Sequence, residues 1–449
     1  MNRLSLFQEL LSNISERGLA LLGPASDAAP DVDDLVAGCD ALLSSRGEAS
    51  GVAYARRVLR GFTALDEDAR LEFYRVLASR YQPEVDEVKA ATEAYLEAQN
   101  PDNLQRLLRA VEPPRQELFR RLNLAPGGTA TLVRMREGLL KHLKEDPSLR
   151  SVDADMAHLF ESWFNRGFLV LRRIDWQTPA HILEKIIAYE AVHEINGWDE
   201  LRRRVDPADR RCFAFFHPAL GDDPLIFVEV ALTTRIPATI EELLDDSREQ
   251  LPVDEARTAV FYSISNCQSG LRGVSLGNFL IKQVAEELRS ELPNLKRFVT
   301  LSPVPGFMSW LRNPESEMTN AAGAALDAIS KPDWHHDETA AGRARDLLLP
   351  LAAHYLLKVK RPDGLPVDPV ERFHLGNGAS LDRLNWLANL SEPGLRQSAG
   401  IMVNYLYNLD KIEANHEDYV DRRRIPSSRQ VRSLVSGKRS EDNKERSSG

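Results

Sequence analysis

The 449-residue sequence predicts a mixed α+β fold in which an all-helical N-terminal bundle precedes an α/β domain. Two observations predict this order. Through about residue 160, apolar residues recur every three or four positions, the spacing of amphipathic helices. Beyond that point, short runs of β-branched and aromatic residues alternate with helical stretches, a pattern typical of a sheet covered by helices. The length also exceeds what one ordinary hydrophobic core organises, which favours more than one domain.

The N-terminal region contains several short helices separated by proline and glycine breaks, of which Pro-Gly-Gly at 126–128 is the clearest. The helix expected after this break places Leu132, Met135 and Leu139 on one face. No group of side chains within residues 1–160 suggests catalysis. We therefore expect these residues to form a helical domain for packing or oligomerisation.

The second domain, expected over residues 161–421, begins where strand-like runs first occur. The expected strands cover 168–171, 212–216, 225–232 and 259–264. Helical stretches are expected at 182–192 and 276–292. From Arg422 onward, nine basic and three acidic side chains accompany many serines, which predicts a flexible polar tail over 422–449. A basic, anion-binding tail is the alternative.

The charge balance limits the classes of partner. Lysine and arginine number 57 against 67 aspartate and glutamate, a formal charge of −10, so the chain lacks the basic field that binds nucleic acid or anionic membranes. No apolar run approaches the roughly 20 residues that span a bilayer. Glu9 and Glu16 argue against a mitochondrial presequence, and three widely separated cysteines cannot build a disulfide framework. We expect a cytoplasmic protein.

A glycine-bearing turn follows the expected strand at 259–264 and opens a long amphipathic helix. Backbone N–H groups in such a turn can approach an anion, and the helix dipole favours its charge. The turn matches neither a P-loop nor the spacing of a Rossmann site. Its stretch Arg272-Gly273-Val274-Ser275-Leu276-Gly277 resembles the coenzyme A pyrophosphate loop of GNAT acyltransferases, Arg/Gln-x-x-Gly-x-Gly/Ala, with Ser275 in place of the first glycine.

Two further stretches carry candidate catalytic groups. Ser302 ends an expected strand just before a Pro-Val-Pro-Gly turn, where a hydroxyl can point into a ligand crevice or simply cap the turn. His374 lies close to an asparagine and two glycines, as a positioned acid–base group or a hydrogen-bonded core histidine. The run His335-His336-Asp337-Glu338 lacks the spacing of a zinc helix, so no metal site is expected.

Together these stretches resemble the malonyl-CoA decarboxylase family. The strings Leu-Ser-Pro-Val-Pro-Gly-Phe at 301–307 and Phe-His-Leu-Gly-Asn-Gly-Ala at 373–379 carry the resemblance, which runs from about Trp163 to Tyr407. It implies a GNAT-like catalytic domain behind a helical oligomerisation domain, in a homotetramer. It also implies a catalytic pair and a coenzyme A loop, namely Ser302 and His374, and Arg272, Gly273, Val274, Ser275, Leu276, Gly277 and Asn278. Some relatives have glutamate at the position of Ser275, so no carboxylate role transfers here.

The resemblance implies that malonyl-CoA is converted to acetyl-CoA and carbon dioxide. No cofactor is expected, because the thioester itself accepts the electrons released when carbon dioxide leaves. His374 would donate the proton to C2, and Ser302 would accept a proton or anchor the malonyl group. A GNAT-type acyltransferase and a non-catalytic acyl-CoA sensor are the alternatives.

Overall fold

The computed structural model describes residues 31–44, 47–274, 280–313 and 318–436. The chain divides into two compact units. The first comprises residues 1–170, 216–225 and 268–276, and the second comprises the rest. A single boundary near residue 160, as the sequence predicts, therefore differs from the structure, because two later segments also join the helical unit.

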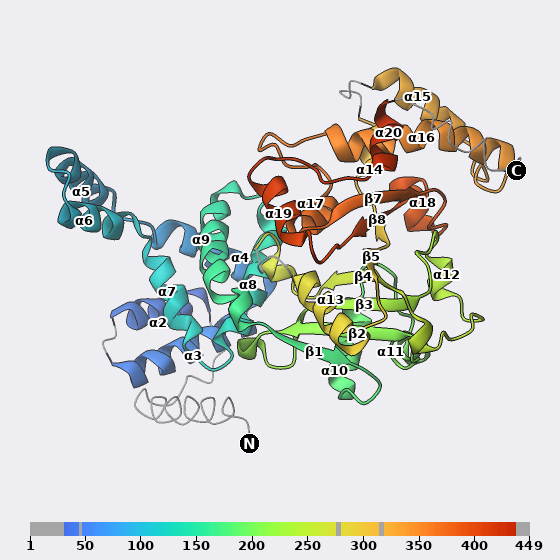
Figure 1. The fold of residues 1–449 in the computed structure, drawn as a ribbon. Helices are drawn as coiled ribbons and strands as arrows, with labels where there is room; N and C mark the ends of the chain where they lie inside the picture. The colour runs from blue at the N-terminus through green and yellow to red at the C-terminus, as the bar shows by residue number, and fades with distance from the viewer. Residues whose placement is uncertain (1–30, 45–46, 275–279, 314–317, 437–449) are drawn as a thin grey trace, which may run out of the picture. The chain divides into compact units, whose positions relative to one another are not determined.

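The first unit is helical (Figure 1). Its helices are α2 (Val32–Ser44), α3 (Glu48–Ala64), α4 (Glu67–Arg80), α5 (Val85–Glu97), α6 (Pro101–Val111), α7 (Pro114–Asn123), α8 (Gly128–His142) and α9 (Arg150–Trp163). Local signals explain several starts: Asp66 caps α4, and Asn100 caps α6 ahead of Pro101. Gly127, at φ +73°, precedes α8. The buried Tyr74 hydroxyl of α4 donates to the Met135 carbonyl of α8 at 2.8 Å, which ties the two helices together.

Helices α5 and α6 form a hairpin with little buried surface, lying side by side in Figure 1. Among the described residues of these two helices, only Ala91 is buried. Both helices instead expose large apolar side chains, at Val85, Leu96, Leu104, Leu108 and Val111. The spacing of the last three places them along one side of α6.

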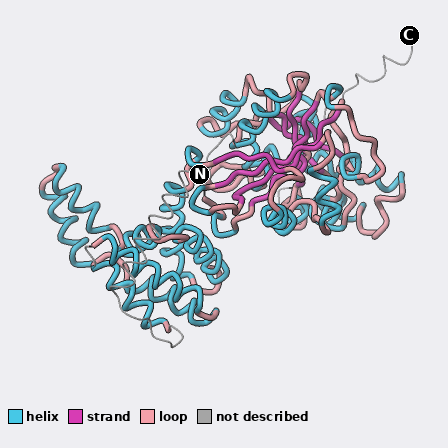
Figure 2. The backbone as a smooth tube through the Cα atoms, turned by 90° about the horizontal axis from the view of Figure 1, so that it is seen from below, coloured by secondary structure: helices cyan, strands magenta, loops and turns pink. Residues whose placement is uncertain are grey.

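The second unit is built on an eight-stranded mixed sheet (Figure 2). Its strands are β1 (Val170–Ile174), β2 (Arg210–Phe216), β3 (Pro224–Thr233), β4 (Thr258–Asn266), β5 (Arg297–Thr300), β6 (Ser302–Pro303), β7 (Ser380–Asn385) and β8 (Met402–Leu406). They follow the order β1-β2-β3-β4-β5-β8-β6, with β7 also paired to β8. Strands β3 and β4 are antiparallel, whereas β4 and β5 are parallel and are connected through α13 (Leu280–Glu291).

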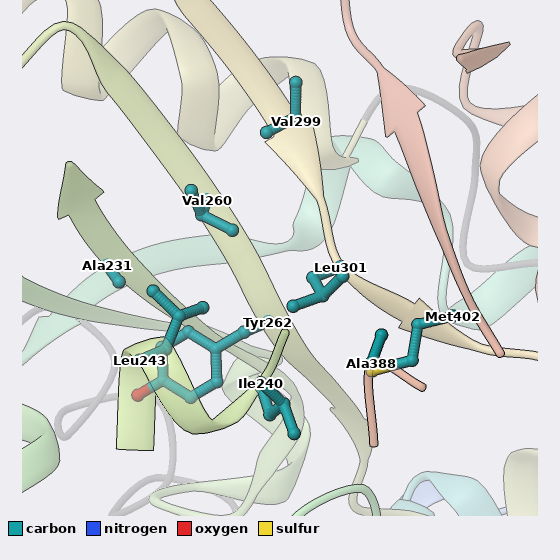
Figure 3. Packing of buried hydrophobic residues seen from close by; sticks show 9 residues of the cluster. All are labelled: Ala231, Ile240, Leu243, Val260, Tyr262, Val299, Leu301, Ala388 and Met402. Carbon is teal, nitrogen blue, oxygen red and sulfur yellow. The ribbon is translucent and has the colours of Figure 1, made fainter. Parts of the chain in front are cut away.

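Strand β4 contains a bulge at Tyr262. Glu229 of β3 pairs with Ser263 and Val230 pairs with Phe261, so Tyr262 has no partner in the register. A bulge redirects the side chains of the strand that carries it. The Tyr262 side chain packs in a buried apolar cluster with Ile240, Leu243, Val260 and other residues (Figure 3).

Eleven α-helices of the second unit, α13 among them, surround this sheet in the described part of the chain. They are α10 (Ala180–Tyr189), α11 (Trp198–Val205), α12 (Glu241–Leu244), α14 (Phe307–Leu311), α15 (Thr319–Ala328), α16 (Glu338–Lys358), α17 (Pro369–Gly376), α18 (Glu392–Ser398), α19 (Ile412–Val420) and α20 (Arg429–Ser436), in addition to α13. The predicted fold class, helices first and a mixed sheet second, is confirmed. Within the described ranges, no helix combines the length and apolar character that crossing a bilayer needs.

The C-terminal region corrects one expectation. Residues 422–436 are not a flexible tail, because they end in α20, where Val431 is fully buried. The segment before α20 also bonds to β7: the Leu381 N–H donates to Pro426, and the Ser428 N–H donates to Leu381. Four of the nine basic side chains that suggested a tail, and all three acidic ones, lie in residues 437–449, outside the described residues.

Candidate active site

Ser302 and His374, predicted separately from two sequence stretches, meet in the second unit. Ser302 begins β6, and His374 lies near the end of α17. The Ser302 hydroxyl lies 2.9 Å from His374 Nε2. Ser302 is 5% exposed and His374 is 2% exposed. The structure therefore brings the two predicted catalytic residues into direct contact.

The ends of α17 fix the position of His374. The Asp368 side chain accepts from the Val370 and Glu371 N–H groups and thereby caps the start of the helix. At the other end, the Asn377 and Ala379 N–H groups donate to the His374 carbonyl.

Gly378 completes this turn. It has φ +81°, and an added Cβ would lie 2.4 Å from the Ile412 carbonyl oxygen. Gly378 is therefore needed in the turn that follows His374 for two reasons. Its backbone conformation favours glycine, and α19 approaches too closely for a side chain.

A chain of hydrogen bonds extends through the pair. His374 Nδ1 lies 2.8 Å from the Tyr407 hydroxyl, and Ser302 donates to Thr300 Oγ1 at 2.9 Å. A serine hydroxyl has one proton, so Ser302 accepts from His374 Nε2–H when it donates to Thr300. His374 Nδ1 then accepts from the Tyr407 hydroxyl. We assign this tautomer because it gives every group in the chain a partner.

Burial sets the protonation of these groups. Desolvation lowers the pKa of His374 from its ordinary 6.5 to about 3. The same effect raises the pKa of Tyr407 well above its ordinary value. The Tyr405 ring stacks on the imidazole, with centroids 4.5 Å apart and planes 26° apart. At neutral pH the histidine is therefore neutral, stacked on the Tyr405 ring, and hydrogen-bonded at both nitrogens.

A cavity of about 380 Å³ opens onto the pair. Apart from Ser302 and His374, most of its wall is apolar or aromatic and includes Val192, Ile226, Phe261, Ile264 and Phe373. Its size and its few convergent polar groups are typical of a site for a small acyl group.

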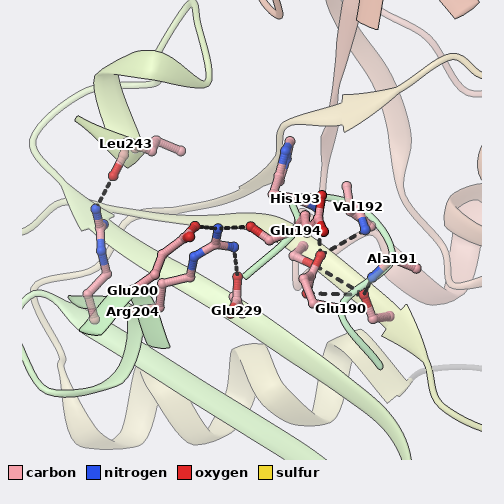
Figure 4. Close-up of polar contacts among 12 residues, drawn as sticks. Glu190, Ala191, Val192, His193, Glu194, Glu200, Arg204, Glu229 and Leu243 are labelled. Carbon is pink, nitrogen blue, oxygen red and sulfur yellow. Dashed lines mark hydrogen bonds and ion pairs between the residues drawn. The ribbon is translucent and has the colours of Figure 1, made fainter. Parts of the chain in front are cut away.

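Glu190 fixes one wall of this cavity (Figure 4). Its carboxylate accepts from the Val192 and His193 N–H groups at 2.8 and 2.7 Å, and from the Ser263 hydroxyl at 2.8 Å. It also accepts from Ser265 at 3.2 Å. These bonds hold residues 190–193 beside β4, and Val192 lines the cavity. Nothing local in the sequence indicates this role, because Glu190 and Ser263 lie 73 residues apart.

The predicted coenzyme loop is described in part, within the first unit. Its first three residues, Arg272, Gly273 and Val274, follow a short 3₁₀ turn at Ser269–Leu271. Ser275, Leu276, Gly277 and Asn278 lie outside the described residues. Gly273 has φ +79°, and an added Cβ would have open space around it.

Helix α8 braces this turn. The buried Arg136 side chain donates to the carbonyls of Gly270 and Arg272 at 2.8 and 3.0 Å, and its third contact is an ion pair with Asp153. An added Cβ on Gly270 would lie 2.0 Å from the Val133 carbonyl oxygen. The turn thus depends on a glycine where α8 approaches and on an arginine 134 residues away from Gly270 in the sequence.

The His335–Glu338 run has a structural role in the described residues. The Asp337 side chain caps α16 by accepting from the Thr339 and Ala340 N–H groups. No group of three His, Cys, Asp or Glu side chains in the part of the chain that the structure describes is arranged to hold a metal ion.

Comparisons with known proteins decide the family. The profile of the malonyl-CoA decarboxylase C-terminal domain matches residues 167–445, and that of the malonyl-CoA decarboxylase N-terminal domain matches residues 81–164. This chain belongs to the malonyl-CoA decarboxylase family. The resemblance that the sequence motifs predict is thereby confirmed.

Relatives within the family cover most of the chain. The mitochondrial malonyl-CoA decarboxylase of Anser anser anser is 37% identical over 353 residues, 72% of this chain and 70% of the relative. That of Rattus norvegicus is 37% identical over 359 residues, 74% and 73% of the two chains.

Two crystal structures named as malonyl-CoA decarboxylases are closely similar in fold. The structure from Rhodopseudomonas palustris is 56% identical, with a TM-score of 0.86, and the match covers 90% of this chain and 99% of that one. The structure from Agrobacterium vitis is 54% identical, with a TM-score of 0.83 and the same coverage.

Proposed function

We propose that this chain converts malonyl-CoA to acetyl-CoA and carbon dioxide, with Ser302 and His374 as its catalytic pair. Membership of the malonyl-CoA decarboxylase family supports the reaction. The observation that carries the residue assignment is the 2.9 Å contact between the Ser302 hydroxyl and His374 Nε2 at the wall of an acyl-sized cavity.

The chemistry needs three things from the protein. The bond from C2 to the carboxylate carbon breaks, carbon dioxide leaves, and the electron pair passes into the thioester as an enolate. A proton added to C2 then gives the methyl group of acetyl-CoA. Because the thioester holds the electron pair, the protein has only to orient the carboxylate, stabilise the enolate oxygen and deliver one proton. A well-placed oxyanion donor contributes about 3 kcal/mol to such a step.

His374 is the proposed proton donor. Its pKa of about 3 in the ligand-free site makes it neutral at pH 7. A negatively charged substrate beside the buried imidazole stabilises the protonated ring and so raises the pKa of His374. Ser302 and Tyr407, the hydrogen-bond partners of the ring, carry no positive charge that would oppose this effect. Protonation of His374 thus accompanies substrate binding, and the Tyr407 hydroxyl holds Nδ1 in place.

Ser302 has two proposed roles that the free site accommodates equally. Its hydroxyl accepts a hydrogen bond from His374 Nε2–H in the tautomer assigned above, so it can hold the ring in place for proton transfer. The same hydroxyl borders the cavity and can anchor the malonyl group. The kinetic tests given in the Discussion distinguish the two roles.

Coenzyme A is proposed to bind through backbone donors of residues 272–278. The described part sharpens this proposal, because the Arg272 and Val274 N–H groups already donate to Ser269 and Leu271 within the turn. Among the described donors of the loop, the Gly273 N–H is the one left for a pyrophosphate oxygen. The bonds from Arg136 to two loop carbonyls orient those oxygens away from a bound anion.

One assay tests the reaction itself. Purified protein is incubated with malonyl-CoA alone, and acetyl-CoA and carbon dioxide are measured. Equal release of both products without an acceptor supports decarboxylation. Release of free coenzyme A only when an amine is added would mean a GNAT-type acyltransferase, and binding without turnover would mean an acyl-CoA sensor.

Self-association through the N-terminal helices is part of the proposal, with a tetramer as the expected state. The exposed apolar side of α6 supports it, since Leu104, Leu108 and Val111 are 41 to 59% exposed. Light scattering should give a multiple of 50.5 kDa, and Leu104→Glu with Leu108→Glu should lower it. A wild-type mass of one chain would overturn this part. Cytoplasmic location also stays a prediction, since the curated relatives are named as mitochondrial.

A further inference from the structure

A second, smaller cavity lies in the second unit away from the Ser302–His374 pair. Residues of α11, the start of β2, α12 and the loop after α12 line it, and its volume is about 120 Å³. Its wall includes three carboxylates and four arginines, namely Arg203, Arg204, Arg210 and Arg248. It shares no lining residue with the cavity beside Ser302.

Three of the arginines have carboxylate partners. These pairs are Arg203 with Asp246, Arg204 with Glu200 and Glu229, and Arg248 with Asp209. The contacts of Arg204 are drawn in Figure 4. These three arginines therefore have four carboxylate partners within the protein.

Arg210 differs from the other three. It is 4% exposed, and within the described residues its guanidinium forms no ion pair. It donates to the Leu243 carbonyl, and it lies 5.8 Å from the centroid of the Tyr262 ring. Desolvation lowers the pKa of Arg210, and the nearby Asp209 and Glu229 raise it only through longer-range attraction.

A buried cation without a counter-ion is costly, and a guanidinium carries five N–H donors. One carbonyl acceptor leaves most of the donors of Arg210 unused. Arginine binds an oxyanion through two parallel hydrogen bonds, which a carbonyl cannot provide. The cavity has room for several water molecules and therefore for a small ion.

We propose that this cavity binds a small oxyanion of the size of inorganic phosphate, with Arg210 as its principal ligand. The ion supplies the pair of oxygen acceptors that Arg210 lacks within the described residues. Tyr262, whose ring contacts the guanidinium, also lines the cavity beside Ser302 and His374. The ion therefore lies one side chain away from the proposed acyl site.

The test measures binding of inorganic phosphate to the full chain by titration calorimetry, at constant ionic strength with chloride as the exchanged salt. Coenzyme A is kept saturating, so that phosphate cannot report on the coenzyme loop. Wild type should bind one phosphate, and Arg210→Met should abolish binding. Arg210→Lys, which keeps the charge but loses the two-pronged contact, should weaken binding at least about tenfold.

Arg202→Gln is the matched control. Arg202 lies on α11, pairs with Asp206 and is absent from the wall of the cavity, so this variant should bind phosphate as wild type does. No phosphate binding by wild type, or unchanged binding by Arg210→Met, would overturn the proposal. If neither Arg210 variant folds, phosphate should raise the Tm of the wild type above its value in chloride of equal ionic strength, with coenzyme A saturating, and an unchanged Tm would overturn the proposal equally.

Discussion

The proposed catalytic pair and the proposed coenzyme loop differ in what the chain contributes. In the second unit, the Ser302–His374–Tyr407 chain consists of side-chain atoms, each held within 2.9 Å of its partner. In the first unit, the described part of the coenzyme loop consists of backbone, with Gly270 against α8 and Gly273 facing open space. One part requires particular atoms to be present, and the other requires side-chain atoms to be absent.

The difference predicts that substitutions in the pair change kcat and that substitutions in the loop change KM. Proton delivery depends on atoms that act at the transition state, so removing one should lower kcat. Anion binding by backbone N–H groups depends on close approach, so adding side-chain atoms should raise KM. Each prediction below removes or adds atoms in one part and measures both constants.

The largest effect is expected at the catalytic pair. His374→Asn keeps a side chain of similar shape but lacks the titratable nitrogen, so kcat should fall much more than KM rises. Ser302→Ala removes one hydroxyl and should lower kcat at least ~10²-fold, by analogy with lost oxyanion donors. Steady-state kinetics on malonyl-CoA measures both. Turnover in deuterated water should place solvent deuterium in the methyl group of acetyl-CoA.

The double variant separates the roles of the two residues. If Ser302 and His374 act as one unit, the double variant should be little worse than the poorer single variant. Additive losses would mean that Ser302 anchors the malonyl group independently of proton transfer. A folded single variant with wild-type kcat would remove that residue from the mechanism.

In the coenzyme loop, Gly273→Val should raise KM and the dissociation constant of acetyl-CoA roughly 10- to 100-fold, the range for losing a hydrogen bond to a charged group. kcat should change little. Gly270→Ala should act in the same direction, because its Cβ would collide with the Val133 carbonyl. Gly342→Val, on the exposed side of α16 with no atom near its Cβ, is the control. A fall in kcat at constant KM would contradict the proposed division of tasks.

The sequence could predict those features of the site that depend on neighbouring residues, but not those that depend on contacts between distant residues. Ser302, His374 and the glycine turn could be singled out from the sequence, because each lies in a short string that carries the family resemblance, and their roles stay predictions. The Arg136 brace and the Glu190 wall were not, since each joins residues more than 70 positions apart and neither has a local pattern. The order of the strands and the docking of α20 on β7 depend on tertiary packing for the same reason.

Tyr407 is an intermediate case. Polar and aromatic residues surround it in the sequence, which fits a lining of the site and core packing equally. In the structure the residue is 1% exposed, and its hydroxyl bonds to His374 Nδ1. Tyr407→Phe should lower kcat about fivefold with KM unchanged, because one net hydrogen bond contributes about 1 kcal/mol. Tyr74→Phe removes an equally buried hydroxyl in the first unit and should lower stability while leaving kcat unchanged. An unchanged kcat in Tyr407→Phe would show that Nδ1 needs no partner.

The smallest effect is expected in the dependence of stability on pH. Unfolding exposes the His374 ring and returns its pKa from about 3 to near 6.5. Below pH 6.5 the unfolded chain therefore binds a proton that the folded chain does not, so this residue makes the free energy of unfolding fall as the pH falls. The limiting slope is about 1.4 kcal/mol per pH unit. His193, whose pKa burial lowers to about 4, adds to the same trend.

Urea denaturation between pH 7.5 and pH 5 measures this slope. In His374→Asn it should be shallower than in wild type by up to about 1.4 kcal/mol per pH unit, whereas the exposed variant His336→Asn should leave it unchanged. Gly273→Val should also leave it unchanged, because it alters no titrating group. Equal slopes in wild type and His374→Asn would mean that the imidazole is not held neutral by burial, and the proposal that substrate binding brings its proton would then fail.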